Sequence, residues 1–173
     1  MILAILTLTQ FTVLHVGISL IAIVSGLIAL PAMARGWWVP RTQAVFLVTT
    51  LLTSLTGFLF PFHGFTPAIG VGVISTIDLL AAFAMLPLLD RARWARAVYA
   101  VSATVALWLN LFVLVVQAFQ KVPPLHALAP AGTEPPFLVA QALLLIGMLV
   151  LGAALLRRGQ ASDARKAASR ATA

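Results

Sequence analysis

Three histidines are the side chains of this sequence best suited to chemistry, and two of them stand in a repeated motif. His63 lies in FPFHGFTP, residues 60–67, and His126 lies in PPLHALAP, residues 123–130. Both motifs read Pro, apolar, His, any, apolar, any, Pro, and the second follows the first by 63 residues. Imidazole is a common ligand of transition metals and carries protons near neutral pH. The repeated histidine therefore indicates a cofactor site or a proton site.

The same offset of 63 residues joins further polar pairs. It carries His15 onto Asp78 and Thr12 onto Ser75. Asp78 is the one acid well inside an apolar segment, where a carboxylate must find a donor or stay protonated. The pairs suggest a parallel repeat about an axis normal to a membrane, as in some transporters. Because the other side chains of the two halves align poorly, the duplication is a hypothesis.

Seven polar side chains are candidates for one polar chamber that opens to the outer face of the membrane, since most of them fall at outer depths of the predicted helices. Polar groups at membrane depth tend to face the bundle interior and mark sites. Thr, Asn and Gln also bond neighbouring helices for about 0.6 to 2 kcal/mol a contact, so a structural role competes with the site. The candidates are His15, His63, Asp78, Asn110, Gln117, His126 and Gln141.

Three chemistries are open to the histidines. His63, His126 and His15, with Asp78 or Glu134, would make an acceptable set for zinc or copper, although no short-range ligand spacing supports it. His63 and His126 would supply the two axial ligands of haem b. His15 and Asp78 would form a proton relay. The competing interpretation makes His63 and His126 interfacial anchors beside prolines that end two helices.

Composition places these residues in a membrane protein. Hydrophobic residues make up 62% of the 173, charged residues 9%, and the mean hydropathy is +1.08, against about half apolar and a quarter charged in soluble domains. The net charge of +7 resides in connections between apolar segments, so no nucleic-acid partner is expected. The absence of cysteine excludes disulfides and thiol catalysis. No phosphate loop, G-x-S-x-G elbow or H-E-x-x-H motif favours an enzyme.

Five apolar segments are long enough to cross a hydrocarbon layer of about 30 Å as helices. Ten of the 11 Lys and Arg residues follow the first, third or fifth segment, and only Lys121 lies on the other side. Since basic residues are retained on the cytoplasmic face, we expect an outer N-terminus and a cytoplasmic C-terminus. The sequence predicts an all-α, polytopic transmembrane bundle over residues 1–157, in which a two-plus-two core carries a fifth helix. The predicted spans are 11–34, 44–62, 70–89, 97–119 and 137–156.

The last residues, 158–173, are small, polar and basic, with no apolar periodicity. This composition predicts a disordered cytoplasmic tail. Anionic lipid is its expected partner, because each basic residue near such a surface contributes about 1 kcal/mol. A plain solvated tail is the competing interpretation.

The stretch LWLNLFVLVVQAFQKVPPLHALAP, followed by EPPF, resembles small bacterial inner-membrane proteins to which no activity is attached. The resemblance covers most of the chain, implies a bacterial inner (cytoplasmic) membrane, and transfers no site residue. Five spans at this length are also similar to the tryptophan-rich sensory proteins of the translocator type. The Trp-Pro and Trp-rich outer motifs of those proteins are absent here.

These observations predict a small, non-catalytic binding or accessory protein of the membrane, with a histidine-containing site near the outer leaflet for a metal, haem or lipid-like ligand. The rival hypothesis is a small proton-coupled transporter or a transporter subunit, and a structural partner of a larger complex is the third. Known alternating-access repeats use more helices. A transporter of this size would therefore be expected to form a homodimer or join a larger membrane complex.

Overall fold

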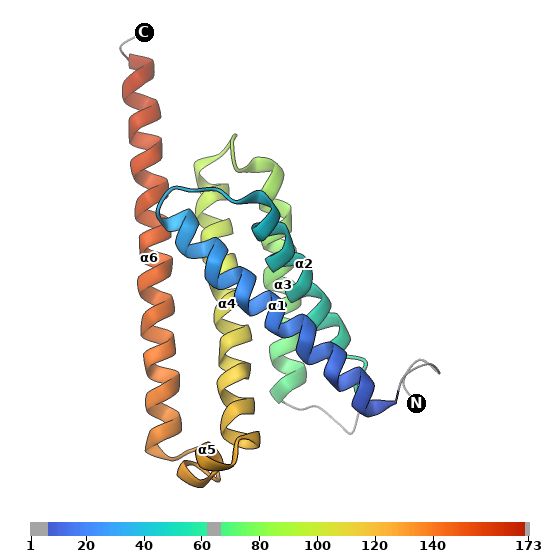
Figure 1. The fold of residues 1–173 in the computed structure, drawn as a ribbon. Coiled ribbons are helices and arrows are strands. Elements are labelled where there is room, and N and C mark those ends of the chain that lie inside the picture. Colours follow the sequence, from blue (N-terminus) through green and yellow to red (C-terminus); the bar gives the residue numbers. More distant parts are fainter. Residues whose placement is uncertain (1–6, 62–66, 172–173) are drawn as a thin grey trace.

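A computed structural model describes residues 7–61 and 67–171, which form a bundle of antiparallel helices (Figure 1). No strand occurs in these two ranges. The N-terminal end of α1 and the short α5 lie at one end of the bundle, and α6 projects beyond the other end (Figure 1). The elements are α1 (Leu8–Ala34), α2 (Pro40–Gly57), α3 (Pro67–Met85), the 3-10 turn η1 (Leu86–Leu88), α4 (Arg93–Lys121), α5 (Pro123–Leu128) and α6 (Pro135–Ala171).

Each predicted apolar segment corresponds to one long helix. Four of the helices, α1, α3, α4 and α6, are long and apolar enough to cross a membrane. The helix α2 ends at Gly57 instead of residue 62 and is less apolar, because Arg41 and Gln43 lie in its first turns and threonines recur along it. An all-helical fold with four candidate membrane spans is thus established for the described residues.

Two segments differ from the sequence-based expectation. The short helix α5 forms in the predicted outer loop, because prolines at the first helical positions lack only N–H groups that would be unpaired there anyway. The helix α6 continues to Ala171, through the stretch from residue 158 that we expected to be disordered. This stretch is rich in Ala and Arg, and it extends an existing helix, so it needs no new nucleus.

Local sequence explains both ends of α1. At its start, Gln10 N donates to Thr7 Oγ1 over 3.2 Å and Thr7 N donates to Gln10 Oε1 over 3.0 Å, which makes a capping box. At its end, the N–H of Trp37 donates to Ala32 O and that of Gly36 to Met33 O, the Schellman pattern. Gly36 has φ +92°, a conformation that favours glycine.

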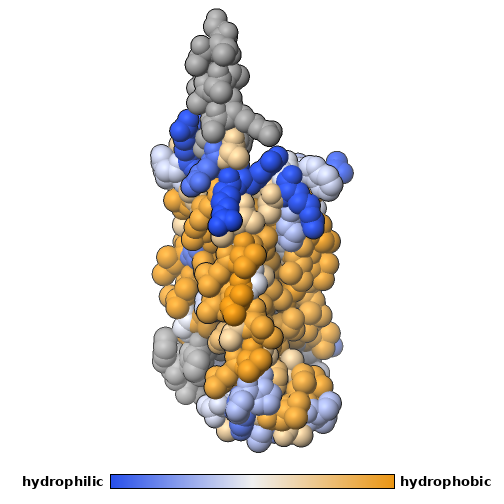
Figure 2. Space-filling model, turned by 90° about the vertical axis from the view of Figure 1, so that its left-hand side faces the viewer, coloured by the Kyte–Doolittle hydropathy of each residue, from blue (hydrophilic) through white to orange (hydrophobic). Residues whose placement is uncertain are grey.

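The core gathers around α4, which contacts α1, α2, α3, α5 and α6. Leu30, Phe46, Leu79, Tyr99 and Leu107 are among its large buried side chains. Outside this core, apolar side chains of α1, α3 and α6 are exposed. On the face shown in Figure 2 they form a belt below a group of hydrophilic side chains. A belt of this kind is typical of a protein surrounded by lipid.

Gly26 lies where α1 crosses α2 and α4, and no room is left there for a side chain. A β-carbon at this position would lie 2.8 Å from Leu107 Cδ1 on α4 and 2.8 Å from Phe46 Cδ2 on α2. Leu107 and Phe46 are fully buried, so neither can move aside without disturbing its neighbours. The glycine therefore sets how closely α1 approaches the two helices.

Gly26→Ala should lower the free energy of unfolding by about 1 to 3 kcal/mol, the usual cost of overpacking a core. Gly17→Ala is the matched control on the same helix, because its β-carbon would meet nothing within 4 Å. Alanine is the better helix former, so that variant should be neutral or more stable by up to about 1 kcal/mol. Thermal unfolding in one detergent compares the two. Equal midpoints for both variants would contradict the tight crossing.

Candidate functional site

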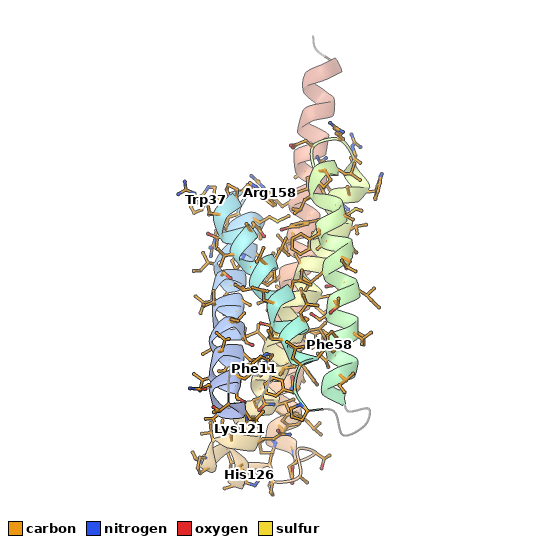
Figure 3. The ribbon with its side chains drawn as sticks, turned by 90° about the vertical axis from the view of Figure 1, so that its right-hand side faces the viewer. Phe11, Trp37, Phe58, Lys121, His126 and Arg158 are labelled. Carbon is orange, nitrogen blue, oxygen red and sulfur yellow. The ribbon has the colours of Figure 1, made fainter. Side chains whose placement is uncertain are left out.

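Charged side chains separate to the two ends of the bundle. Arg158 and Trp37 lie at one end, whereas Lys121 and His126 lie at the other (Figure 3). The arginines that precede Arg158 in the chain belong to the same end, since they lie on the turns between α1 and α2 and between η1 and α4, at the start of α2 or α4, or next to Arg158 on α6. They are Arg35, Arg41, Arg91, Arg93, Arg96 and Arg157. The apolar belt between the ends thus contains no described Lys or Arg.

His15 lies between α1 and α2, one helical turn from Phe11 and so near the end that carries Lys121 (Figure 3). Its Nδ1 is 2.8 Å from Thr56 Oγ1. The Thr56 hydroxyl donates its own proton to Leu52 O over 2.7 Å. A hydroxyl has only one proton, so while Thr56 donates to Leu52 O, His15 Nδ1 carries a proton and donates it to Thr56 Oγ1. In neutral His15, Nε2 therefore keeps a free lone pair, and no described residue hydrogen-bonds to it.

Two aromatic rings complete the surroundings of His15. The Phe60 ring meets the imidazole edge to face, with centroids 5.2 Å apart. Phe60 also meets Phe11 at 4.9 Å, and Phe11 is buried. One hydrogen bond and one ring contact thus hold the imidazole in a fixed orientation. A histidine oriented through Nδ1 with Nε2 free is the arrangement of a metal-ligating imidazole.

The other two histidines do not join His15 within the described residues. His63 lies outside them, so its part in a shared site stays a prediction. His126 lies exposed on α5. Within residues 7–61 and 67–171, no three side chains of the His, Cys, Asp or Glu type come together to hold a metal ion. A bare metal ion thus lacks a complete ligand set in this part of the chain.

The Glu134 carboxylate accepts hydrogen bonds from its own loop. Its Oε1 accepts from the N–H of Ala131 and its Oε2 from the N–H of Thr133, both over 2.9 Å. These backbone N–H groups, Ala131 first, hold the pKa of Glu134 below its ordinary value. Glu134 is the last residue of the turn before α6, which begins at Pro135. It is engaged as a cap for this turn.

Asp78 of α3 contacts α4, and Asn110 of α4 contacts α2. The Ser102 hydroxyl on α4 interacts with the Asp78 carboxyl, while Asp78 Oδ2 is buried with no hydrogen-bond partner. Asn110 Nδ2 donates to Thr50 Oγ1 on α2 over 3.1 Å. These pairs connect α3 to α4 and α4 to α2.

The two glutamines lie on α4 and α6. Gln141 of α6 donates from Nε2 to the backbone oxygen of Phe112 on α4 over 3.2 Å. The Oε1 atoms of Gln141 and Gln117 are buried without a hydrogen-bond partner. No hydrogen bond joins any two of the six described candidates. Three of the six, His15, Asn110 and Gln141, hydrogen-bond across three different helix pairs.

Residues that are 63 positions apart do not occupy equivalent places in the helices. Adding it to Arg35, which ends α1, gives Val98, which lies inside α4. Adding it to Thr56, the partner of His15, gives Phe119, which cannot accept a hydrogen bond through its side chain. The two helical hairpins therefore place His15 and Asp78 in different surroundings.

Sequence analysis missed the partners of the candidate residues. Phe11, Phe60 and Ser102 had no distinguishing signal, since aromatic and small residues recur throughout the apolar segments. It also missed the buried hydrogen bond from Tyr99 Oη to Gln43 Oε1, at 2.8 Å. Here a signal existed, because Tyr99 is the only tyrosine of the chain and a buried phenol needs an acceptor.

Comparisons with protein families, with curated proteins and with solved structures gave no match to this chain. The class of the protein consequently follows from its own features. They define an all-helical bundle with four helices that can cross a membrane, basic side chains gathered at one end, and an oriented histidine toward the other.

Glu134→Gln should lower the melting temperature at neutral pH, because the amide is a weaker acceptor for the two backbone N–H groups. Because the pKa of Glu134 is lower in the folded state, its ionised carboxylate stabilises the fold at every pH above the pKa of the unfolded state. This stabilisation is lost as the pH falls through the folded-state pKa. The difference between variant and wild type should therefore shrink as the pH falls below the unfolded-state value of about 4.3. Melting curves of both proteins over this range test it. A difference independent of pH would contradict the ionic role.

Proposed function

We propose that this protein is a small, non-catalytic binding or accessory protein of the membrane that holds haem through His15. The observation that carries the proposal is the pair of hydrogen bonds at Thr56, which leaves Nε2 of His15 with a free lone pair. Imidazole in this state binds iron without first losing a proton. The site lies near the end of Lys121, which we assign to the outer face.

Haem suits this site better than a bare metal ion. A bare zinc or copper ion needs three or four protein ligands, whereas haem iron has four ligands in its own ring and needs only one or two more. His15 is one such axial ligand, and His63 or His126 is the sequence-based choice for the second. Phe60, which contacts the His15 ring and is partly exposed, offers apolar surface to a porphyrin.

The test is to purify the protein without chelator, add haem, and record its absorption in the Soret region. Wild type should bind haem, and His15→Ala should lose it. Thr56→Val removes the hydroxyl that orients His15 and should weaken haem binding about 10- to 100-fold, as loss of such an orienting hydrogen bond does in metal sites. Thr49→Val is the matched control, because Thr49 bonds only to the backbone of its own helix, and it should bind as wild type does.

His126→Ala and His63→Ala then assign the second axial ligand. If neither folded His15→Ala nor folded Thr56→Val differs from wild type, the proposed site is wrong. Elemental analysis for Zn, Cu and Fe on the same sample detects a bare metal ion. A protein that takes up neither haem nor metal contradicts the proposal and favours the structural interpretation of the histidines.

We further propose that all five long helices, α2 included, cross a bacterial inner membrane, with the N-terminus outside and the arginine-bearing end in the cytoplasm. The one-sided arginines support this orientation, because basic residues are retained on the cytoplasmic face. Anionic lipid of that leaflet is the expected partner of these side chains. The last turns of α6 extend the same end (Figure 1).

Single cysteines test the orientation, since the chain has none of its own. An impermeant thiol reagent added to intact cells should label Thr66→Cys and Ala127→Cys and spare Trp37→Cys and Asp90→Cys until the cells are opened. Positions 37 and 66 flank α2, so labelling of both from one side would show that α2 does not cross. A fully reversed pattern would invert the orientation.

A further inference from the structure

Asp78 is the acidic side chain that the bundle holds at membrane depth, and its surroundings are apolar. It lies near the middle of the candidate span Ile69–Leu88. Ile74 and Ile77, close to it on the same helix, are 57% and 64% exposed, as expected for side chains that face lipid. Asp78 itself is half-buried against α4. The carboxyl group thus lies at the edge of the α3–α4 interface, next to the bilayer.

No basic side chain of the described residues compensates the charge of Asp78. The described arginines lie toward one end of the bundle and Lys121 at the other (Figure 3). Along α3 and η1, Asp78 is 11 residues from Leu89, or roughly 16 Å at the rise of an α-helix. The one described side chain that interacts with the carboxyl is Ser102, a neutral hydroxyl. A carboxylate with no counter-charge at this depth must be neutralised by a bound ion.

The number of nearby ligands decides which ion. Calcium and magnesium require about six oxygen ligands or more, whereas Ser102 is the only described side chain that adds an oxygen to those of Asp78. A proton needs a single carboxylate oxygen. Oδ2 of Asp78 is buried and makes no hydrogen bond, which leaves it free to carry a proton. We infer that Asp78 is an exchangeable proton-binding site inside the bundle.

Buried hydroxyl groups lie near this site on α3 and α2. Ser75 is one turn from Asp78 on α3, and Ser54 Oγ on α2 donates to Ser75 Oγ over 3.0 Å. Ser54 lies one turn from Thr50, which accepts the amide of Asn110. Hydroxyl groups can hold water and pass protons. The inference of a proton site does not depend on a complete route or on haem binding at His15.

A lipid-soluble carbodiimide tests the inference on the full-length protein in detergent or liposomes. The protonated carboxyl adds across one N=C bond of the reagent; its proton passes to nitrogen, and the adduct rearranges to a stable N-acylurea. Mass spectrometry of peptides should find the adduct on Asp78 at about pH 6 and a yield that falls about tenfold per pH unit once the proton dissociates. Asp90, exposed at the η1–α4 turn outside the candidate span, should stay unmodified by a reagent that dissolves in the apolar phase.

Two variants and one added salt make the result decisive. Asp78→Asn should abolish the adduct, and Asp78→Glu should retain it. Because the adduct is mapped on the wild-type chain, the test holds even if Asp78→Asn fails to fold. Absence of the adduct from folded wild type at every pH, or a yield independent of pH, would overturn the inference. Protection by sodium at fixed pH would instead identify a metal-cation site and overturn the assignment of a proton.

Discussion

The close crossing of three helices at Gly26 is the constraint on which the rest of the bundle depends. With no side chain at this position, α1 approaches Phe46 of α2 and Leu107 of α4 together, and these two side chains form the centre of the buried core. From the crossing, α1 runs beside α2 toward the end of Lys121 (Figure 1). That course brings His15 within hydrogen-bonding distance of Thr56. The orientation of the imidazole is therefore a consequence of backbone packing about three turns away on α1.

Polar groups in the apolar belt follow a second constraint, because hydrocarbon provides no hydrogen-bond partners. Most of them are partnered between two helices or with their own backbone. Tyr99 pairs with Gln43, Ser54 with Ser75, and Asn110 with Thr50. These pairs join α2 to α3 and α4 at successive depths. Such hydrogen bonds are worth about 0.6 to 2 kcal/mol each in membrane proteins, so they add to the stability that apolar contacts supply.

Two polar atoms without a described partner are the basis of the two proposed sites. Nε2 of His15 has no described partner, and Asp78 Oδ2 is buried without one. The first is a lone pair suited to iron, and the second an oxygen suited to a proton. They lie on different helix pairs, α1–α2 and α3–α4, and the offset that relates them in the sequence is not repeated in the hydrogen bonds they make. The two sites can therefore be tested and altered separately.

The amino-acid sequence by itself determined the helical class, the approximate course of each long helix and the gathering of arginines at one end. These features depend on composition and spacing along the chain: apolar runs of membrane length form helices because every backbone group must bond within the segment. Tertiary structure alone decided which polar side chains meet. Thr56 and Ser102 became partners of His15 and Asp78 through the rotation and tilt of neighbouring helices, which depend on side-chain volumes at crossings such as Gly26. It also decided how α2, the long helix outside the four candidate spans, is bound to its neighbours, because Gln43, Thr50 and Ser54 hydrogen-bond to side chains of α4 and α3.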